Sequence, residues 1–121
     1  MDVAVTITEA AESTGQTATP ITIRAMVDTG ASGTAIQTGF AKQLGLNPVG
    51  VQLISTPTSK DVPCPEYAMR LIFQANIVID NVTVIEAPME GQHVQMLIGR
   101  DVLKDFVFIY LGYANQFTLS R

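Results

Sequence analysis

The feature that most restricts the fold of this chain is a dense series of short β-type segments along its 121 residues. Each segment alternates apolar and polar residues or runs in β-branched residues, and turn-forming residues stand between several of them. The predicted strands are Val3–Thr8, Ile21–Val27, Val49–Ile54, Met69–Ile79, Val82–Ala87, Phe106–Leu111 and Phe117–Leu119. Turns of hairpin type are predicted at Ser13–Gly15, Asp80–Asn81 and Gly112–Asn115, which favours mostly antiparallel pairing. Strands this closely spaced in one domain, residues 1–121, predict a small closed barrel or sandwich.

Two short helices are expected to interrupt the strands. In Thr38–Leu44, the residues Phe40, Ala41 and Leu44 have helical spacing, Thr38 is a candidate N-cap and Gly45 suits the position after the C-cap. The second predicted helix is Arg100–Lys104.

Composition excludes several classes of function. With 47% hydrophobic and 15% charged residues, the chain is expected to form a compact core. A net charge of -4, with seven Lys and Arg in total, lacks the basic surface that nucleic-acid binding needs. Cys64 is the one cysteine and His93 the one histidine, so we expect no disulfide, no metal site and no cofactor. No apolar run is long enough to cross a membrane and Met1–Asp2 opens no signal segment, so we expect a cytoplasmic protein.

The segment that carries chemistry is Ala25–Ile36, in which an apolar strand runs into Asp28-Thr29-Gly30 and a second apolar stretch leaves it. Gly30 allows a close backbone approach or a positive φ, and Thr29 and Ser32 supply hydroxyls that can fix a turn. Such a triplet arises by chance in on the order of a few in a hundred chains of this length. A second element, Met96–Leu103, is an apolar run that ends in glycine at a helix start.

The two elements, in this order and at this spacing, resemble those of the retropepsin-like aspartic proteases, the single-lobe relatives of pepsin. The matching residues are Asp28–Ser32 and Leu97–Asp101, together with the helix end Gln43–Leu46, which is typical of bacterial and cellular members, and a closing hairpin over Phe106–Leu119. The resemblance implies an all-β acid-protease barrel with two short helices and one lobe per chain. It also implies an aspartic endopeptidase that cleaves extended polypeptides.

The resemblance assigns roles by position. Asp28 corresponds to the catalytic aspartate, and Thr29 to the residue whose hydroxyl contacts its counterpart across a dimer axis. Gly30 corresponds to the glycine of the substrate floor. Leu97, Ile98 and Gly99 would support the loop from below. The residues that contact the bound peptide would lie beside Asp28 and in the hairpin that covers the substrate, called the flap: Ala31, Ser32, Ile54, Ser55, Thr56 and Val62.

Two departures from the retroviral pattern are visible. Ser32 stands where retroviral members often have an acidic residue paired with the arginine matched by Arg100, so Arg100 must have another partner. The flap tip, expected between Ser55 and Pro65, contains three prolines in place of glycines, which fix φ and remove hydrogen-bond donors.

The chain contains a single Asp-Thr-Gly, whereas peptide hydrolysis by carboxylates needs an acid and a base. We therefore expect a homodimer in which Asp28 of each chain supplies half of a dyad that activates water. Two alternatives stay open: a catalytically silent dimeric module of the same fold that binds peptides or protein partners, and a structural domain in which Asp28 only closes a turn.

Overall fold

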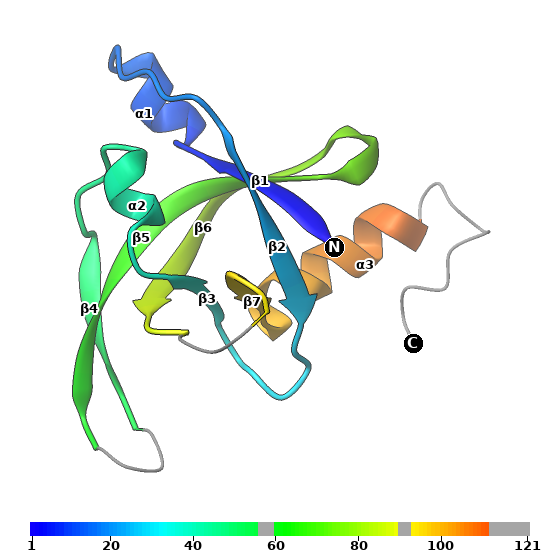
Figure 1. Cartoon of the computed structure of the whole chain (residues 1–121). Helices are drawn as coiled ribbons and strands as arrows, with labels where there is room; N and C mark the ends of the chain where they lie inside the picture. The colour runs from blue at the N-terminus through cyan, green and yellow to red at the C-terminus, as the bar shows by residue number, and fades with distance from the viewer. Residues whose placement is uncertain (56–59, 90–92, 112–121) are drawn as a thin grey trace.

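The computed structural model describes residues 1–55, 60–89 and 93–111 (Figure 1). This part of the chain contains seven strands and three α-helices. The strands are β1 (Asp2–Thr6), β2 (Ile21–Val27), β3 (Thr34–Gln37), β4 (Gly50–Ile54), β5 (Val62–Phe73), β6 (Ile77–Ala87) and β7 (Met96–Ile98). The helices are α1 (Glu9–Ser13), α2 (Phe40–Gln43) and α3 (Arg100–Leu111), and a 3₁₀ turn, η1 (Gln74–Asn76), joins β5 to β6.

Six of these strands close into a barrel. The sheet order is β1-β2-β7-β3-β6-β5-β4, and an additional pairing of β1 with β5 joins the first strand to the sixth. β4 pairs with β5 alone and forms a hairpin that extends away from the barrel (Figure 1). The predicted fold class, a closed β-barrel of the acid-protease type with one lobe in the chain, is confirmed.

The barrel core follows from the alternation of apolar residues along the strands. Every second residue of a strand faces the same side, so Val3 and Val5 of β1 and Ile23 and Ala25 of β2 point inward and are buried. Strands β3, β5, β6 and β7 add Ile36, Met69, Leu71, Val84, Met96 and Ile98, all nearly inaccessible to solvent. Burial of each large apolar side chain contributes about 1.5–3 kcal/mol.

The two parallel pairings of the sheet lie on either side of the Asp28 loop. β2, which enters the loop, runs parallel to β7, and β3, which leaves it, runs parallel to β6. β3 also pairs antiparallel with β7, so β7 lies between the two strands. β3 and β7 together hold the two ends of the loop at one end of the barrel. Neither strand was predicted, because both are short.

The first helix, α1, is an element that the sequence analysis missed. Thr8 caps it by accepting a hydrogen bond from the Ala11 N–H at 3.2 Å. The Arg70 guanidinium forms ion pairs with Glu12 at 2.8 Å and Asp80 at 3.1 Å. α1 is thereby tied to β5 and β6, and the predicted turn at Ser13–Gly15 lies where this helix ends.

The helix α2 confirms the prediction over Thr38–Leu44, with one correction at its start. The N-cap is Gly39, not Thr38 as predicted. Gly39 has a φ of 108°, and no side chain forms a capping hydrogen bond at this helix start. Its C-terminus is as predicted: Gly45 has a φ of 73°. The Gly45 and Leu46 N–H groups bond back to the carbonyls of Lys42 and Ala41, both at 3.0 Å, which is a Schellman motif.

The predicted strand Met69–Ile79 and the turn at Asp80–Asn81 are wrong. The chain reverses earlier, at η1, where Asn76 has a φ of 60°. Asp80 and Asn81 lie within β6, opposite a register shift between Met69 and Leu71. Asn81 has a φ of 60°, so the Asp-Asn pair marks a β-bulge, which uses the same left-handed conformation as a tight turn.

The predicted strand Phe106–Leu111 is also wrong, because α3 continues past Lys104 to Leu111. Aromatic and β-branched residues lower helix stability by at most about 0.7 kcal/mol each, too little to end a helix that has already begun. The first half of the predicted closing hairpin Phe106–Leu119 is therefore helical. Its second half, with the turn Gly112–Asn115 and the strand Phe117–Leu119, lies outside the described residues. None of the described helices is long and apolar enough to span a membrane.

Candidate active site

The Asp28 loop is a tight turn at the end of β2. The Asp28 carbonyl accepts a hydrogen bond from the Ala31 N–H at 3.1 Å, which closes the turn. The Asp28 carboxylate oxygen Oδ1 accepts from the Gly30 N–H at 3.0 Å, an arrangement that aspartate favours in turns. Asp28 is half-buried, while Thr29 and Gly30 are exposed. The carboxylate is thus fixed by its own turn and reachable from solvent.

Glycine is needed at position 30 because the backbone lies close to the Asp28 carboxylate, not because of an unusual φ. It is absent from the glycines with positive φ, and a Cβ at this position would lie 3.3 Å from Asp28 Oδ1. Any side chain here would press on the carboxylate that Gly30 also hydrogen bonds. Of the two possibilities that the sequence left open, close approach is the correct one.

The predicted support residues do meet the loop. The Asp28 N–H donates to the Ile98 carbonyl at 2.9 Å, and Val27 is in register with Ile98. Ile98 and Gly99 are buried and Leu97 is half-buried. A Cβ on Gly99 would lie 2.6 Å from the Gly33 carbonyl carbon and 2.9 Å from the Ala31 carbonyl oxygen. Only glycine lets these two backbone segments pack this closely.

The N-terminus of α3 is attached to the same loop. The first N–H groups of a helix lack partners within the helix, and here the Arg100 N–H donates to the Ala31 carbonyl at 2.9 Å and the Asp101 N–H to the Ser32 carbonyl at 3.2 Å. The Arg100 side chain donates from Nη1 to the Thr29 carbonyl at 3.1 Å. Thr29 O is therefore the partner that Arg100 uses where Ser32 offers no carboxylate.

Thr34 and Asp101 also hold the loop in place, and neither was predicted as a site residue. Thr34 is fully buried, and its hydroxyl donates to Asp101 Oδ1 at 2.8 Å and accepts from the Gly99 N–H at 3.1 Å. Asp101 Oδ2 also accepts from the Thr34 N–H at 3.3 Å, and Oδ1 accepts from the Val102 N–H at 2.8 Å. Thr34 thus connects the loop exit to the glycine beneath the loop. The sequence did contain a signal for Thr34: it is a polar residue two positions before Ile36, so it falls on the inward face of the strand, where a polar side chain needs a hydrogen-bond partner.

The remaining predicted site residues fall on two separate parts of the chain. Ala31, half-buried, and Ser32, exposed, belong to the Asp28 loop. Ile54 and Val62 are half-buried partners in the β4–β5 hairpin, and Ser55 is exposed beside them. Thr56 lies outside the described residues. The hairpin and the Asp28 loop extend toward the same end of the molecule (Figure 1), but no described contact joins them within this chain.

The hairpin also corrects the expected flap tip. Val62–Pro65 lie in β5, in register with β4 from Ile54↔Val62 to Val51↔Pro65, so the tip begins after Ile54 and ends before Val62. The pairing of β5 with β6 ends at Glu66. Pro63 and Pro65 lie beyond that point, where one edge of β5 is unpaired among the described residues and a missing N–H breaks no pairing.

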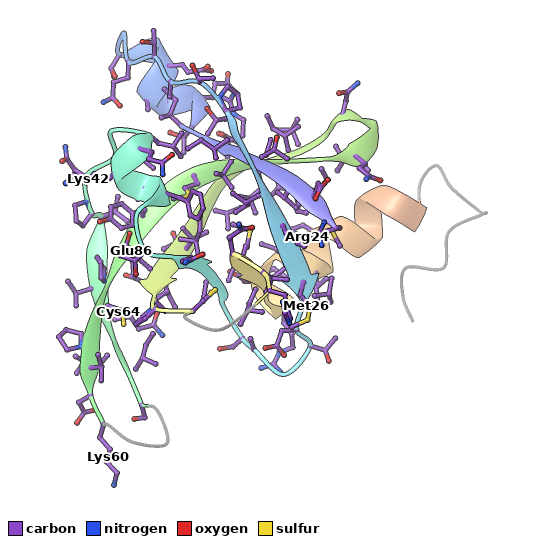
Figure 2. All side chains as sticks on the ribbon, in the orientation of Figure 1. Arg24, Met26, Lys42, Lys60, Cys64 and Glu86 are labelled. Atoms are coloured by element: carbon purple, nitrogen blue, oxygen red, sulfur yellow. The ribbon has the colours of Figure 1, made fainter. Side chains whose placement is uncertain are left out.

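A tyrosine and a glutamate lie at the base of this hairpin. Burial raises the pKa of Tyr67 above its ordinary value, and the negative charge of Glu86 raises it further. The Glu86 carboxylate accepts a hydrogen bond from the Gly39 N–H at 3.2 Å, and Figure 2 shows this side chain between β5 and α2. Glu86 therefore connects the start of α2 to β6.

A closed single-lobe barrel with an Asp-Thr-Gly turn held over the glycine that follows β7 defines the acid-protease class of fold. The family model for aspartyl proteases matches residues 8–102, and the chain belongs to this family. No curated protein matches. Among solved structures, the chain is similar to Lpg0085 from Legionella pneumophila, a protein of unknown function, with a TM-score of 0.50 and 15% identity, covering 85% of this chain and 83% of that one. This likeness concerns the fold alone.

Proposed function

We propose that this chain is a retropepsin-like aspartic endopeptidase that hydrolyses peptide bonds in extended polypeptides, with Asp28 as its catalytic carboxylate. The observation that carries the proposal is the geometry of the Asp28 loop. Its backbone is fixed by hydrogen bonds to Ile98 and to the start of α3, while the carboxylate is accessible. A reacting carboxylate needs this combination of rigid placement and access to water and substrate.

The proposal requires a second carboxylate, and we assign it to Asp28 of a second copy. Other aspartates of the chain have structural partners: Asp101 bonds to Thr34, and Asp80 to Arg70. Asp2, Asp61 and Asp105 are exposed, on β1, on the hairpin and on α3, and none of them has a described hydrogen bond to the Asp28 loop. A homodimer with its two-fold axis between the Asp28 residues supplies the dyad without any further change in the chain.

The dyad would act by sharing one proton. One carboxylate takes a proton from the attacking water while its protonated partner donates to the carbonyl oxygen of the scissile bond. Two carboxylates a few ångströms apart cannot both ionise readily, so they titrate in two separated steps. Activity is then greatest when one proton is shared, which gives an acid-shifted pH optimum.

Substrate would bind as an extended strand between the loop and the hairpin. Main-chain hydrogen bonds give affinity in this mode and side-chain pockets give selectivity. Ala31 and Ser32 flank Asp28 on the loop side, and Ile54 and Val62 face substrate from the hairpin. As apolar walls, Ala31, Ile54 and Val62 would favour apolar side chains in the substrate, and Ser32 would offer it a hydrogen bond.

The test is cleavage of a diverse peptide mixture between about pH 4 and 7, read by mass spectrometry. Asp28→Asn keeps an oxygen that can accept from the Gly30 N–H, so it should fold normally and cut nothing. Asp105→Asn is the matched control: it removes an exposed aspartate and should cleave like the wild type. If wild type and Asp28→Asn are both folded and neither cleaves, the catalytic proposal fails and the peptide-binding module replaces it.

A further inference from the structure

Among the described residues, β4 pairs with β5 alone and has one open edge, and it presents an apolar face to solvent. Val51 and Leu53 are 63% and 60% exposed, and as alternate residues of β4 they share one face of the hairpin. Val49, which directly precedes β4, is 62% exposed. Pro63 and Pro65 stand opposite Leu53 and Val51 in β5 and extend this face. Neither Val51 nor Leu53 belongs to the core cluster.

The prolines indicate which backbone groups of β4 are free. In an antiparallel pair, opposite residues alternate between pairs that exchange two hydrogen bonds and pairs that exchange none. Pro63 and Pro65 have no N–H to exchange, so the bonded pairs are the intervening ones, such as Gln52 with Cys64. The N–H and C=O groups of Val51 and Leu53 therefore point to the open edge.

The edge also lacks the usual protection against pairing. Exposed edge strands normally carry charged residues, especially lysine, that prevent association with another strand. Between Lys42 and Lys60 no residue of this chain is charged. Figure 2 shows these two lysines at opposite ends of this stretch, at α2 and at the end of the hairpin. The whole of β4 is therefore neutral and open to a partner strand.

We propose that the β4 edge binds the β4 edge of a second copy, antiparallel, about a two-fold axis at Gln52. In this register Val51 lies opposite Leu53 of the other copy, and their free N–H and C=O groups meet as a bonded pair. Opposite residues of paired strands share a face of the sheet, so Val51 and Leu53 of the two copies form one continuous apolar surface. No like charges come together, so the strand is complementary to itself, as an isologous contact requires. This contact is separate from the Asp28 dyad and does not depend on catalysis.

A disulfide measures the register directly. Gln52 would face its own copy in a non-bonded pair with Cα atoms about 4.5 Å apart, within the range of about 4.4–6.8 Å that disulfides span. In a Cys64→Ala background, Gln52→Cys should therefore form a covalent dimer on mild oxidation. Val78→Cys is the matched control: Val78 is 47% exposed on β6, and this variant should stay uncrosslinked.

Lysine substitutions measure the contribution of the edge to association. Sedimentation of the wild type over about a hundredfold range of concentration should show an association step through β4, additional to any dimer formed through Asp28. Val51→Lys should remove this β4 step alone, and Val78→Lys should retain it. Circular dichroism checks that both variants fold. The proposal is overturned if Val51→Lys associates like the wild type, if Gln52→Cys gives no dimer, or if both cysteine variants crosslink equally, which indicates random aggregation. None of these readouts uses peptidase activity, and the β4 substitutions leave the Asp28 loop unchanged, so failure of this proposal can be distinguished from failure of the proposed function.

Discussion

Gly99→Ala is the perturbation that most directly tests how the Asp28 loop is supported. The new Cβ would lie 2.6 Å from the Gly33 carbonyl carbon and 2.9 Å from the Ala31 carbonyl oxygen. The Ala31 carbonyl accepts from the Arg100 N–H, and the peptide unit that contains the Gly33 carbonyl is held by the Thr34 N–H, which donates to Asp101 Oδ2. No flexible side chain can move aside, so the loop must separate from β7.

Gly33→Ala supplies the matched control on the other side of the same contact. A Cβ there would meet only Ile85 Cδ1, at 3.7 Å, an ordinary packing distance. Neither glycine has a positive φ, so backbone strain does not separate the two variants. Gly33→Ala should be neutral or stabilising by up to about 1 kcal/mol through the unfolded state. Gly99→Ala should lose about 1–3 kcal/mol through overpacking.

Urea unfolding followed by circular dichroism gives both free energies of unfolding, provided that the slope with urea is unchanged. At about 4 °C per kcal/mol, Gly99→Ala should also lower Tm by roughly 4–12 °C. A Gly99→Ala variant as stable as Gly33→Ala would refute the close packing of β7 against the loop.

Three further predictions concern the surroundings of the site. Thr34→Val should cost about 1–3 kcal/mol in urea unfolding, because the buried Gly99 N–H loses its acceptor; Thr34→Ser should restore most of it, and equal losses for both would contradict the role of the hydroxyl. Arg70→Gln should accelerate amide hydrogen exchange in α1 and leave the barrel strands protected; unchanged exchange in α1 would show that the ion pairs do not hold it. Burial and Glu86 raise the pKa of Tyr67, so the folded state favours the neutral phenol. The contribution of Tyr67 to the free energy of unfolding is therefore fully present below its unfolded pKa of about 10, and it is lost as pH rises through the folded pKa. Tyr67→Phe should flatten that alkaline loss of stability, and identical pH profiles would contradict it.

The barrel was predictable from the sequence because it depends on alternation. β2 was predicted with its observed bounds, and the C-terminus of α2 was found because Gly45 has a distinctive conformation. The errors arose where one residue type serves two structures. Asn81 adopts the same positive φ in a bulge as in a turn, and Phe106–Leu111 suits a strand but continues a helix that starts at Arg100.

The site was predictable in part, because its chemistry lies in contiguous residues. Asp28-Thr29-Gly30 could be read directly, and the role of Gly99 followed from the resemblance to the retropepsin-like proteases. The Thr34–Asp101 hydrogen bond joins residues 67 positions apart, and nothing local in either segment predicts it. The partner of Arg100 is a backbone carbonyl, which carries no side-chain signal in any sequence.

If two chains share one active site, as we propose, mixing active and inactive subunits reveals it. Wild type and Asp28→Asn are mixed at fixed total concentration, allowed to exchange, and assayed on a peptide that the wild type cleaves. With free exchange, an equal mixture contains about one quarter wild-type dimers, so cleavage should fall to about a quarter of the pure wild-type rate and follow the square of the wild-type fraction. A rate that falls linearly, to about one half, would show that each chain works alone and would contradict the shared dyad.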